Sequence, residues 1–239
     1  MLVPMCGRFS LTVRGRVRVA EVEERVVEID VPAPRYNVAP GQSVTVIRRG
    51  RSGVEGAFLR WGLIPSWAQD PKMAFQCTNA RAETVATRPA FRDAFRQRRC
   101  AVPVDGFFEW ERSGRSPLPW RFVRPDRSVF LLAGLWETWR PPGDQADVET
   151  FTLITTGANA DMAPIHDRMP VLLDPTTLRT WMDPRSNLAS LEGVMQPSPE
   201  ATLVRHRVST VVNNARNEAP DCIEPFEESG PMEGFLPLG

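Results

Sequence analysis

Apolar residues along this chain gather in short runs rich in β-branched and aromatic types, with Gly, Pro, Asn or Asp between the runs. Runs of this length and composition are typical of β-strands that are buried on at least one face. We expect strands at residues 44–47, 54–61, 100–110, 119–123, 129–136, 150–155 and 203–208.

Helical periodicity is weaker and is confined to residues 17–29, 89–98, 159–164 and 175–183. In the second of these segments, Pro89 suits the first turn of a helix. Arginines recur there at helical spacing, which predicts that they share one face: Arg88, Arg92, Arg96 and Arg99. The buried side is expected to hold Phe91, Ala94 and Phe95. Whether the arginine face binds a partner or is only solvated stays open at this point.

Strands outnumber helices and do not alternate with them, which excludes a doubly wound parallel sheet. At 239 residues, with no internal repeat or low-complexity linker, the chain is long enough for one large core. We predict a single α+β domain, mixed and mostly antiparallel, over residues 6–223. Residues 1–5 are expected to be a leader or a mis-assigned start, and residues 224–239, rich in Gly, Pro and Glu, a flexible tail.

Composition narrows the function classes. The longest clean apolar run, residues 129–136, is far too short to span a bilayer, and the first residues lack the features of a signal peptide. We expect a soluble cytoplasmic protein that needs no membrane. The four cysteines have no C-x-x-C spacing and the chain has two histidines, so no metal site and no cofactor are expected.

Charge gives little indication of a nucleic-acid partner, because Lys+Arg and Asp+Glu both total 29. The distribution is less even than the total. Residues 81–99 contain six arginines and only two acidic residues.

Cys6 is the first candidate for chemistry. A single cysteine is most often a small buried hydrophobe, but Met5 offers a second start directly before it. An N-terminal cysteine carries an amine and a thiol two carbons apart. The amine can condense with an aldehyde to a Schiff base, and the thiol then closes a thiazolidine ring. The reference pKa of an α-amine, about 7.7–8.0, leaves a useful neutral fraction at physiological pH.

Two further residues suit proton transfer. Glu109 stands among aromatic residues, where burial would favour its neutral form and suit a general acid or base, although an ordinary strand-end ion pair is the simpler interpretation. His166, beside Asp167 and Arg168, suits either a proton carrier or a structural hydrogen-bonding residue.

Three more residues suit ligand contacts. Asn79 could hydrogen-bond a bound group or cap a turn, and Arg81 could pair with a phosphate or with Glu83. Trp67 lies on a Pro-flanked segment, residues 65–72, that we expect to be an exposed loop. An exposed indole is a platform on which a nucleic-acid base can stack.

Six stretches, in order along the chain, resemble the motifs of the SOS-response-associated peptidase (SRAP) family, whose members include abasic-site processing and shielding proteins. They are MCGRF (residues 5–9), RYNVAP (35–40), WGLIP (61–65), NARAET (79–84), DGFFEW (105–110) and IHDRMP (165–170). The resemblance spans about residues 5–223.

The resemblance implies a β-barrel-like core with flanking helices and a positive groove that binds single-stranded DNA containing abasic sites. It also implies that Cys6 is the crosslinking nucleophile, that Asn79 orients the sugar or the amine, that Glu109 assists ring opening, and that His166 acts on the Schiff base and on reversal. DNA contacts are expected from Arg81, Trp67, Arg8, Asn37 and Arg88. We expect a monomer.

One departure from the family pattern matters, because Leu2 to Met5 stand between the initiator methionine and Cys6. The thiazolidine requires a free amine on Cys6, so either translation starts at Met5 and the methionine is trimmed, or the protein itself cuts the Met5–Cys6 bond. Two alternatives remain open: a cysteine peptidase that uses Cys6 and His166 on other proteins, and a non-catalytic reader of modified or single-stranded DNA.

Overall fold

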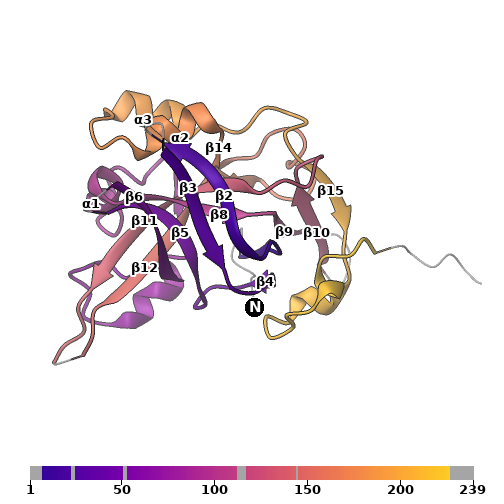
Figure 1. Ribbon diagram of the computed structural model, residues 1–239, viewed down its shortest axis with the longest axis horizontal. Helices are drawn as coiled ribbons and strands as arrows, with labels where there is room; N and C mark the ends of the chain where they lie inside the picture. The colour runs from indigo at the N-terminus through magenta and orange to yellow at the C-terminus, as the bar shows by residue number, and fades with distance from the viewer. Residues whose placement is uncertain (1–6, 23–24, 51–52, 112–116, 144, 227–239) are drawn as a thin grey trace, which may run out of the picture.

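The protein contains two β-sheets packed face to face, with helices and a β-hairpin around them (Figure 1). The computed structural model describes residues 7–22, 25–50, 53–111, 117–143 and 145–226. The larger sheet consists, in spatial order, of β13 (Arg168–Pro170), β12 (Val148–Gly157), β6 (Gly53–Trp61), β5 (Ser43–Gly50), β8 (Arg99–Val104), β11 (Phe130–Trp139) and β14 (Leu172–Leu173), with β7 (Asn79–Arg81) paired to β12.

The larger sheet closes on itself. Strand β12 pairs with β6 on one edge and with β11 on the other, so β12, β6, β5, β8 and β11 form a ring. Pairing of β12 with β6 and β7 is parallel, and the other pairings recorded for this sheet are antiparallel. The expected α+β domain with a mostly antiparallel, barrel-like core is therefore confirmed.

The smaller sheet is antiparallel and consists of β15 (Val204–Arg207), β10 (Leu118–Val123), β9 (Gly106–Glu111), β1 (Arg8–Leu11) and β4 (Arg35–Val38). Its inner face packs on the barrel through Phe9, Val38, Phe107 and Phe122, which share one buried cluster with Trp61 and other barrel residues. The described residues also form three short α-helices: α1 (Arg92–Gln97), α2 (Pro175–Met182) and α3 (Leu188–Val194). Three 3₁₀ turns occur at η1 (Pro71–Gln76), η2 (Thr210–Asn213) and η3 (Pro220–Cys222).

The expected helix over residues 17–29 is wrong, because this segment forms a hairpin of β2 (Gly15–Val22) and β3 (Arg25–Val31). In β3, Val27, Ile29 and Val31 are buried while the two residues between them are exposed. This period of two is the pattern of a strand that covers a sheet. The Thr45 hydroxyl of β5 donates to the Asp30 carbonyl at 3.4 Å, consistent with β3 lying against the barrel.

Helix α1 also differs from the prediction. It begins at Arg92, and Arg99 lies in β8 with only 7% of its surface exposed. The Arg99 guanidinium donates to the carbonyls of Phe95, Arg96, Trp181 and Asp183, and so binds the ends of α1 and α2. Arg99 is therefore not part of a solvated arginine face, whereas the expected buried residues Phe91, Ala94 and Phe95 are buried.

Three other segments depart from the sequence-based expectation. Residues 159–164 form consecutive turns instead of a helix, α3 was not foreseen, and the run 100–110 is two strands separated at Asp105. The Asp105 carboxylate lies between the sheets' edges and accepts from the Ser10 hydroxyl at 2.6 Å and from Arg121 Nη2 at 2.8 Å. A buried ion pair thereby joins β1, β9 and β10.

The fold extends at least to Phe226, because Val208 pairs with Pro225 and the Phe226 amide donates to the Arg207 carbonyl at 2.8 Å. The proposed leader, residues 1–5, and most of the proposed tail, residues 227–239, lie outside the described residues. Among the described residues, no helix is long and apolar enough to cross a membrane.

Candidate active site

Two of the sequence motifs meet at the carboxyl end of β12. Along one edge of β12, Leu153 pairs with Asn79 and Thr155 pairs with Arg81. Along the other edge, Gly157 pairs with Arg168, two residues after His166. Because β7 and β13 are both short and continue into turns, their polar residues are brought to one end of the barrel.

Trp61 connects the smaller sheet to the strand that carries Asn79. The Phe9 ring of β1 packs on the Trp61 ring with centroids 5.0 Å apart. Trp61 Nε1 donates to the carbonyl of Thr78, the residue before Asn79, at 2.8 Å. Cys6 lies outside the described residues, but β1 begins two residues after it. Trp61 therefore contacts both the strand that follows Cys6 and the residue that precedes the Asn79 strand.

Glu109 is almost completely buried, with 2% of its surface exposed. It lies on β9, where Phe108 pairs with Arg8 of β1 and Glu109 itself pairs with Trp120 of β10. Since alternate residues of a strand face the same side, Glu109 faces the inside with Phe107. Phe107 shares its apolar cluster with Ile165 and Met169, the neighbours of His166 in its motif.

His166 is largely buried, and its Nδ1 atom has two neighbours with opposite requirements. The Arg168 amide donates to Nδ1 at 3.1 Å, which needs an unprotonated nitrogen. An Asp167 carboxylate oxygen lies 2.9 Å from the same atom, which needs a protonated nitrogen. Each protonation state of the ring thus has a partner within the chain, an arrangement that suits a residue that gains and loses a proton.

Arg168 is a charged residue of the site that the sequence reasoning did not single out, although it belongs to the His166 motif. Its Nη1 and Nη2 atoms contact the two Glu83 carboxylate oxygens at 2.5 and 2.9 Å, and Nη2 also donates to the Thr155 carbonyl at 2.7 Å. These hydrogen bonds hold the pKa of the Glu83 carboxyl below its ordinary value, and Arg81 adds to the shift. The sequence suggested either a phosphate or Glu83 as the partner of Arg81. In the structure the Glu83 carboxylate accepts its hydrogen bonds from Arg168.

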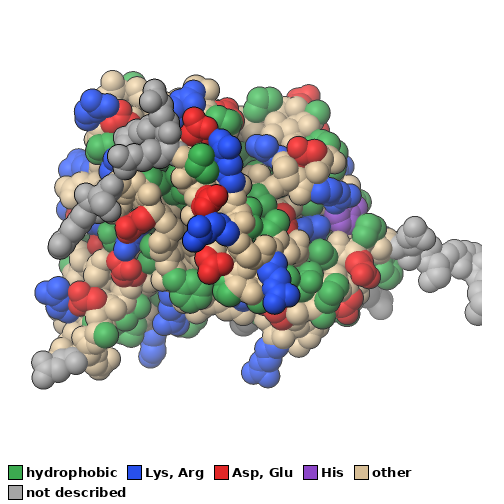
Figure 2. Space-filling view, in the orientation of Figure 1, with side chains coloured by type: hydrophobic (Ala, Val, Ile, Leu, Met, Phe, Trp, Pro, Cys, Tyr) green, Lys and Arg blue, Asp and Glu red, His purple; other side chains and the backbone are tan. Residues whose placement is uncertain are grey.

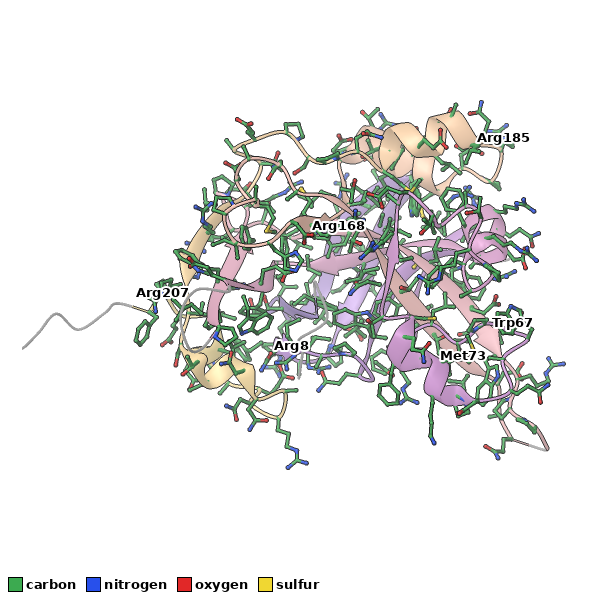
Figure 3. All side chains as sticks on the ribbon, turned by 180° about the vertical axis from the view of Figure 1, so that it is seen from behind. Arg8, Trp67, Met73, Arg168, Arg185 and Arg207 are labelled. Atoms are coloured by element: carbon green, nitrogen blue, oxygen red, sulfur yellow. The ribbon has the colours of Figure 1, made fainter. Side chains whose placement is uncertain are left out.

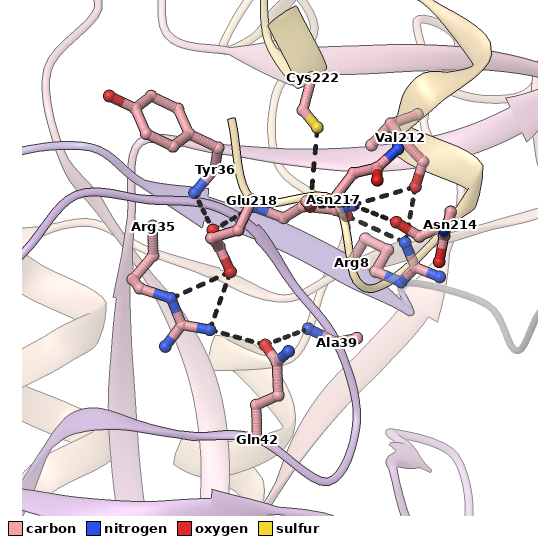
Figure 4. Close-up of polar contacts among 11 residues, drawn as sticks. Arg8, Arg35, Tyr36, Ala39, Gln42, Val212, Asn214, Asn217, Glu218 and Cys222 are labelled. Atoms are coloured by element: carbon pink, nitrogen blue, oxygen red, sulfur yellow. Dashed lines mark hydrogen bonds and ion pairs between the residues drawn. The ribbon is translucent and has the colours of Figure 1, made fainter. Parts of the chain in front are cut away.

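Arg8 and Asn37, two expected DNA contacts, both bond to the C-terminal part of the chain. Figure 4 shows Arg8 beside Val212 and Asn214. Asn37 is fully buried, and its side-chain nitrogen Nδ2 donates to the carbonyls of Val212, Asn214 and Asn217. The Arg8 guanidinium donates to Asn37 Oδ1 at 2.9 Å and to the Val212 carbonyl at 2.7 Å. Burial lowers its pKa, although a guanidinium remains charged. The buried Asn37 side chain therefore fixes the position of the C-terminal segment.

Glu218 completes this network. Its carboxylate accepts hydrogen bonds from the backbone amides of Tyr36 and Asn37. It also accepts one from Arg35 Nη2, at 3.1 Å. The segment 209–222 is therefore bound to β1 and β4 by side chains from both directions. We call it the C-terminal latch.

Trp67 is 53% exposed on a turn whose backbone is fixed, since Trp139 Nε1 donates to the Ala68 carbonyl at 2.7 Å. The expected exposed loop with a tryptophan is present. Phe75, 70% exposed on η1, was not singled out, because an isolated Phe carries no signal of exposure in the sequence. In Figure 3, Arg8 and Arg168 lie nearer the middle of the molecule, whereas Trp67 lies toward one side.

The face that carries the β2–β3 hairpin has mixed charge. Figure 2 shows positive and negative side chains interspersed on this face, among the residues that it draws in colour. Arg88 is exposed, with its guanidinium 5.8 Å from the Phe91 ring centroid.

In the part of the chain that the structure describes, no three His, Cys, Asp or Glu side chains are grouped as a metal site. Cys77, Cys100 and Cys222 are buried free thiols.

Comparison with known proteins gives one consistent family. Residues 5–215 match the family model described as SOS response associated peptidase (SRAP). The abasic site processing protein YoqW of Bacillus subtilis is 36% identical over 231 residues, which cover 92% of this chain and 99% of that protein. The abasic site processing protein YedK of Escherichia coli is 31% identical, covering 92% of this chain and 100% of that protein.

Solved structures agree with the fold. A protein from Bacteroides thetaiotaomicron superposes with a TM-score of 0.76 at 22% identity, covering 92% of this chain and all of that one. A phage-related protein from Bordetella bronchiseptica superposes with a TM-score of 0.66 at 27% identity, covering 85% of this chain and 94% of that one.

Proposed function

This chain belongs to the SOS response associated peptidase (SRAP) family, and from that premise we propose that it captures abasic sites in single-stranded DNA through Cys6. The observation that carries the proposal is the convergence of four motifs. The strand after Cys6, the Asn79 strand, buried Glu109 and the His166 turn all border one apolar cluster around Trp61. Relatives that align over nearly their whole length are named abasic site processing proteins, which supports DNA as the substrate class.

The reaction proceeds in two bond-forming steps. The ring-opened abasic sugar presents an aldehyde at C1′, and the Cys6 α-amine adds to it. Loss of water gives a Schiff base. The Cys6 thiolate then adds to the imine carbon, the nitrogen takes up a proton, and a thiazolidine crosslink closes. No oxidant or cofactor is consumed.

The surrounding residues supply the protons and the geometry. Glu109 transfers the proton that opens the sugar ring, since a buried carboxyl group can hold a proton near neutral pH. His166 exchanges a proton at the Schiff-base stage and in reversal, for which its two Nδ1 neighbours provide partners. Asn79 orients the sugar or the amine. Arg81 binds a phosphate, a base stacks on Trp67, and the exposed Arg88 adds positive charge for the DNA backbone.

Capture also requires a free α-amine on Cys6. We propose that Cys6 becomes N-terminal by one of two routes. In the first, translation starts at Met5 and the methionine is trimmed. In the second, the Cys6 thiol attacks the Met5 carbonyl with Glu109 assisting, the Met5–Cys6 amide bond breaks to give a thioester, and water hydrolyses the thioester to release residues 1–5. Intact-mass analysis of protein expressed from Met1 separates the routes. Self-cleavage predicts loss of five residues in the wild type and retention in Glu109→Gln.

The decisive experiment is incubation with an abasic single-stranded oligonucleotide followed by a denaturing gel. The wild type should give a covalent band, Cys6→Ala should give none, and the matched control Cys222→Ala should behave as wild type. Both variants should retain binding to unmodified single-stranded DNA. A stable band with Cys6→Ala would refute capture through this residue. Binding without any band would instead indicate a non-catalytic reader, and cleavage of added proteins would indicate a peptidase.

A further inference from the structure

The Glu83 carboxylate lies close to two arginines, Arg81 and Arg168, whose strands both pair with the carboxyl end of β12. Glu83 contacts Arg168 through both carboxylate oxygens, a two-pronged geometry that phosphate oxygens also adopt on a guanidinium. Arg81 is close enough to lower the pKa of the same carboxyl group. Three charged side chains from two different motifs are thus in electrostatic contact in the free protein.

The two partners differ in their access to solvent. The Arg168 side chain is 13% exposed, whereas the Glu83 side chain is 53% exposed. Arg168 is also anchored from below, because Nη2 donates to the Thr155 carbonyl of β12 at 2.7 Å. An anion that approaches from solvent therefore meets the carboxylate first, and of the two side chains it is the carboxylate that has room to move.

That room is a hollow of about 320 Å³ next to Glu83, bordered by Ala82, Thr156, Glu192, Met195 and Gln196. A glutamate side chain released from Arg168 can turn into this hollow and remain hydrated. Release leaves the hydrogen bonds of the turn intact, since the Thr84 and Val85 amides bond to the Arg81 carbonyl. The only backbone amide recorded against the carboxylate within the described residues is that of Glu83 itself.

We propose that Glu83 occupies, in the free protein, the position that a DNA phosphate takes on Arg168, so that DNA binding displaces this carboxylate from the guanidinium. The inference rests on the proposed binding of single-stranded DNA. Glu83 acts as an internal competitor: it keeps the guanidinium aligned and discourages loosely held anions, and it yields to a phosphate that the rest of the groove positions.

An internal competitor changes how binding depends on salt. A phosphate that neutralises a cation exposed to solvent releases bound counterions, with a slope of about 0.7 per contact for single strands. In the wild type the phosphate loses its condensed cation to Arg168, but the released Glu83 carboxylate attracts a cation in turn, so little net cation release results. With glutamine at position 83 no carboxylate is released, and the contact contributes its full share to the slope.

The test compares wild type with Glu83→Gln in binding an unmodified single-stranded oligonucleotide, by fluorescence anisotropy over a range of salt concentrations. The variant should bind about two- to fivefold more tightly at low salt. Its slope should also be steeper by about 0.7. Glu192→Gln is the matched control, because it removes one negative charge from the same hollow and Glu192 forms no ion pair within the described residues. It should leave the slope unchanged.

A second measurement does not use DNA. Inorganic pyrophosphate should raise the thermal midpoint of Glu83→Gln more than that of wild type, because Arg168 is available to it only in the variant. Binding by Glu83→Gln that is equal to or weaker than wild type, or an unchanged slope, overturns the inference and leaves DNA binding by the wild type intact. Absence of DNA binding by both proteins overturns the proposed function as well.

Discussion

The rings of Phe9 and Trp61 pack with centroids 5.0 Å apart, and this contact joins the smaller sheet to the barrel. Trp61 continues the connection by donating its indole N–H to the Thr78 carbonyl. The relative position of the strand after Cys6 and the strand of Asn79 therefore depends on one buried indole.

Trp61→Phe tests this connection. The substitution keeps an aromatic ring but removes one of the two donors to the Thr78 carbonyl, which retains the Leu153 amide at 3.2 Å. Loss of this one hydrogen bond should cost about 0.5–1.5 kcal/mol of unfolding free energy. The rate of crosslinking should also fall, because Asn79 loses its fixed position. Urea denaturation measures the first effect and single-turnover gel kinetics the second. Trp67→Phe is the control, since that indole is 53% exposed and should leave stability unchanged.

Asp105→Asn should destabilise the protein by about 3–5 kcal/mol. The buried Arg121 guanidinium, 7% exposed in its side chain, would lose its charge partner while remaining in the interior. Chemical denaturation gives the free energy. The exposed pair of Arg140 and Asp147 provides the comparison, and Asp147→Asn should have no measurable effect. Similar midpoints for the two variants would contradict the assigned importance of the buried pair.

Glu109→Gln should slow crosslinking by roughly 10²–10⁴-fold while preserving noncovalent binding to single-stranded DNA. The substitution retains the size of a side chain that is 2% exposed and removes the proton it can transfer. Glu111→Gln, two residues later on the same strand, is the control, because its carboxylate accepts a hydrogen bond from Trp120 that an amide oxygen can also accept. An unchanged rate for Glu109→Gln at neutral pH would assign Glu109 a structural role only.

Native thiol labelling at neutral pH should modify a single cysteine. Burial raises the pKa of the Cys77, Cys100 and Cys222 thiols, which lowers the fraction present as reactive thiolate. Intact-mass analysis after brief alkylation should therefore show one adduct, at Cys6, and four after denaturation. Prior incubation with abasic single-stranded DNA should prevent the native adduct. Two or more native adducts would show that a buried thiol is accessible.

The sequence predicted the barrel strands well where buried β-branched residues recur within one short segment, as in β5. It failed at the β2–β3 hairpin. The valines of the two strands, with Glu, Arg and Ala between them, resemble the spacing of one helix when the two strands are taken as a single segment. The strand character of β3 is set by packing against the barrel, as the Thr45–Asp30 bond indicates. No local pattern contains that information.

The motifs identified the candidate site residues, but not the work that each performs. Arg168 and Glu83 are 85 positions apart, and Asn37 bonds to a carbonyl 175 positions later. Pairings over such distances depend on the whole sheet arrangement. Sequence reasoning accordingly did not foresee the bonds of Asn37 to the C-terminal segment and did not single out Arg168.

The C-terminal latch has a consequence for biosynthesis. Arg8 bonds to the Val212 carbonyl, 204 positions later in the chain. At about 5–20 residues per second, the ribosome delivers that partner on the order of 10–40 s after it has made Arg8. The strand next to the nucleophile therefore waits, without its final contacts, until translation is nearly finished. A nascent chain cannot assemble the complete site ahead of time, and a prematurely terminated product that lacks the latch should be inactive.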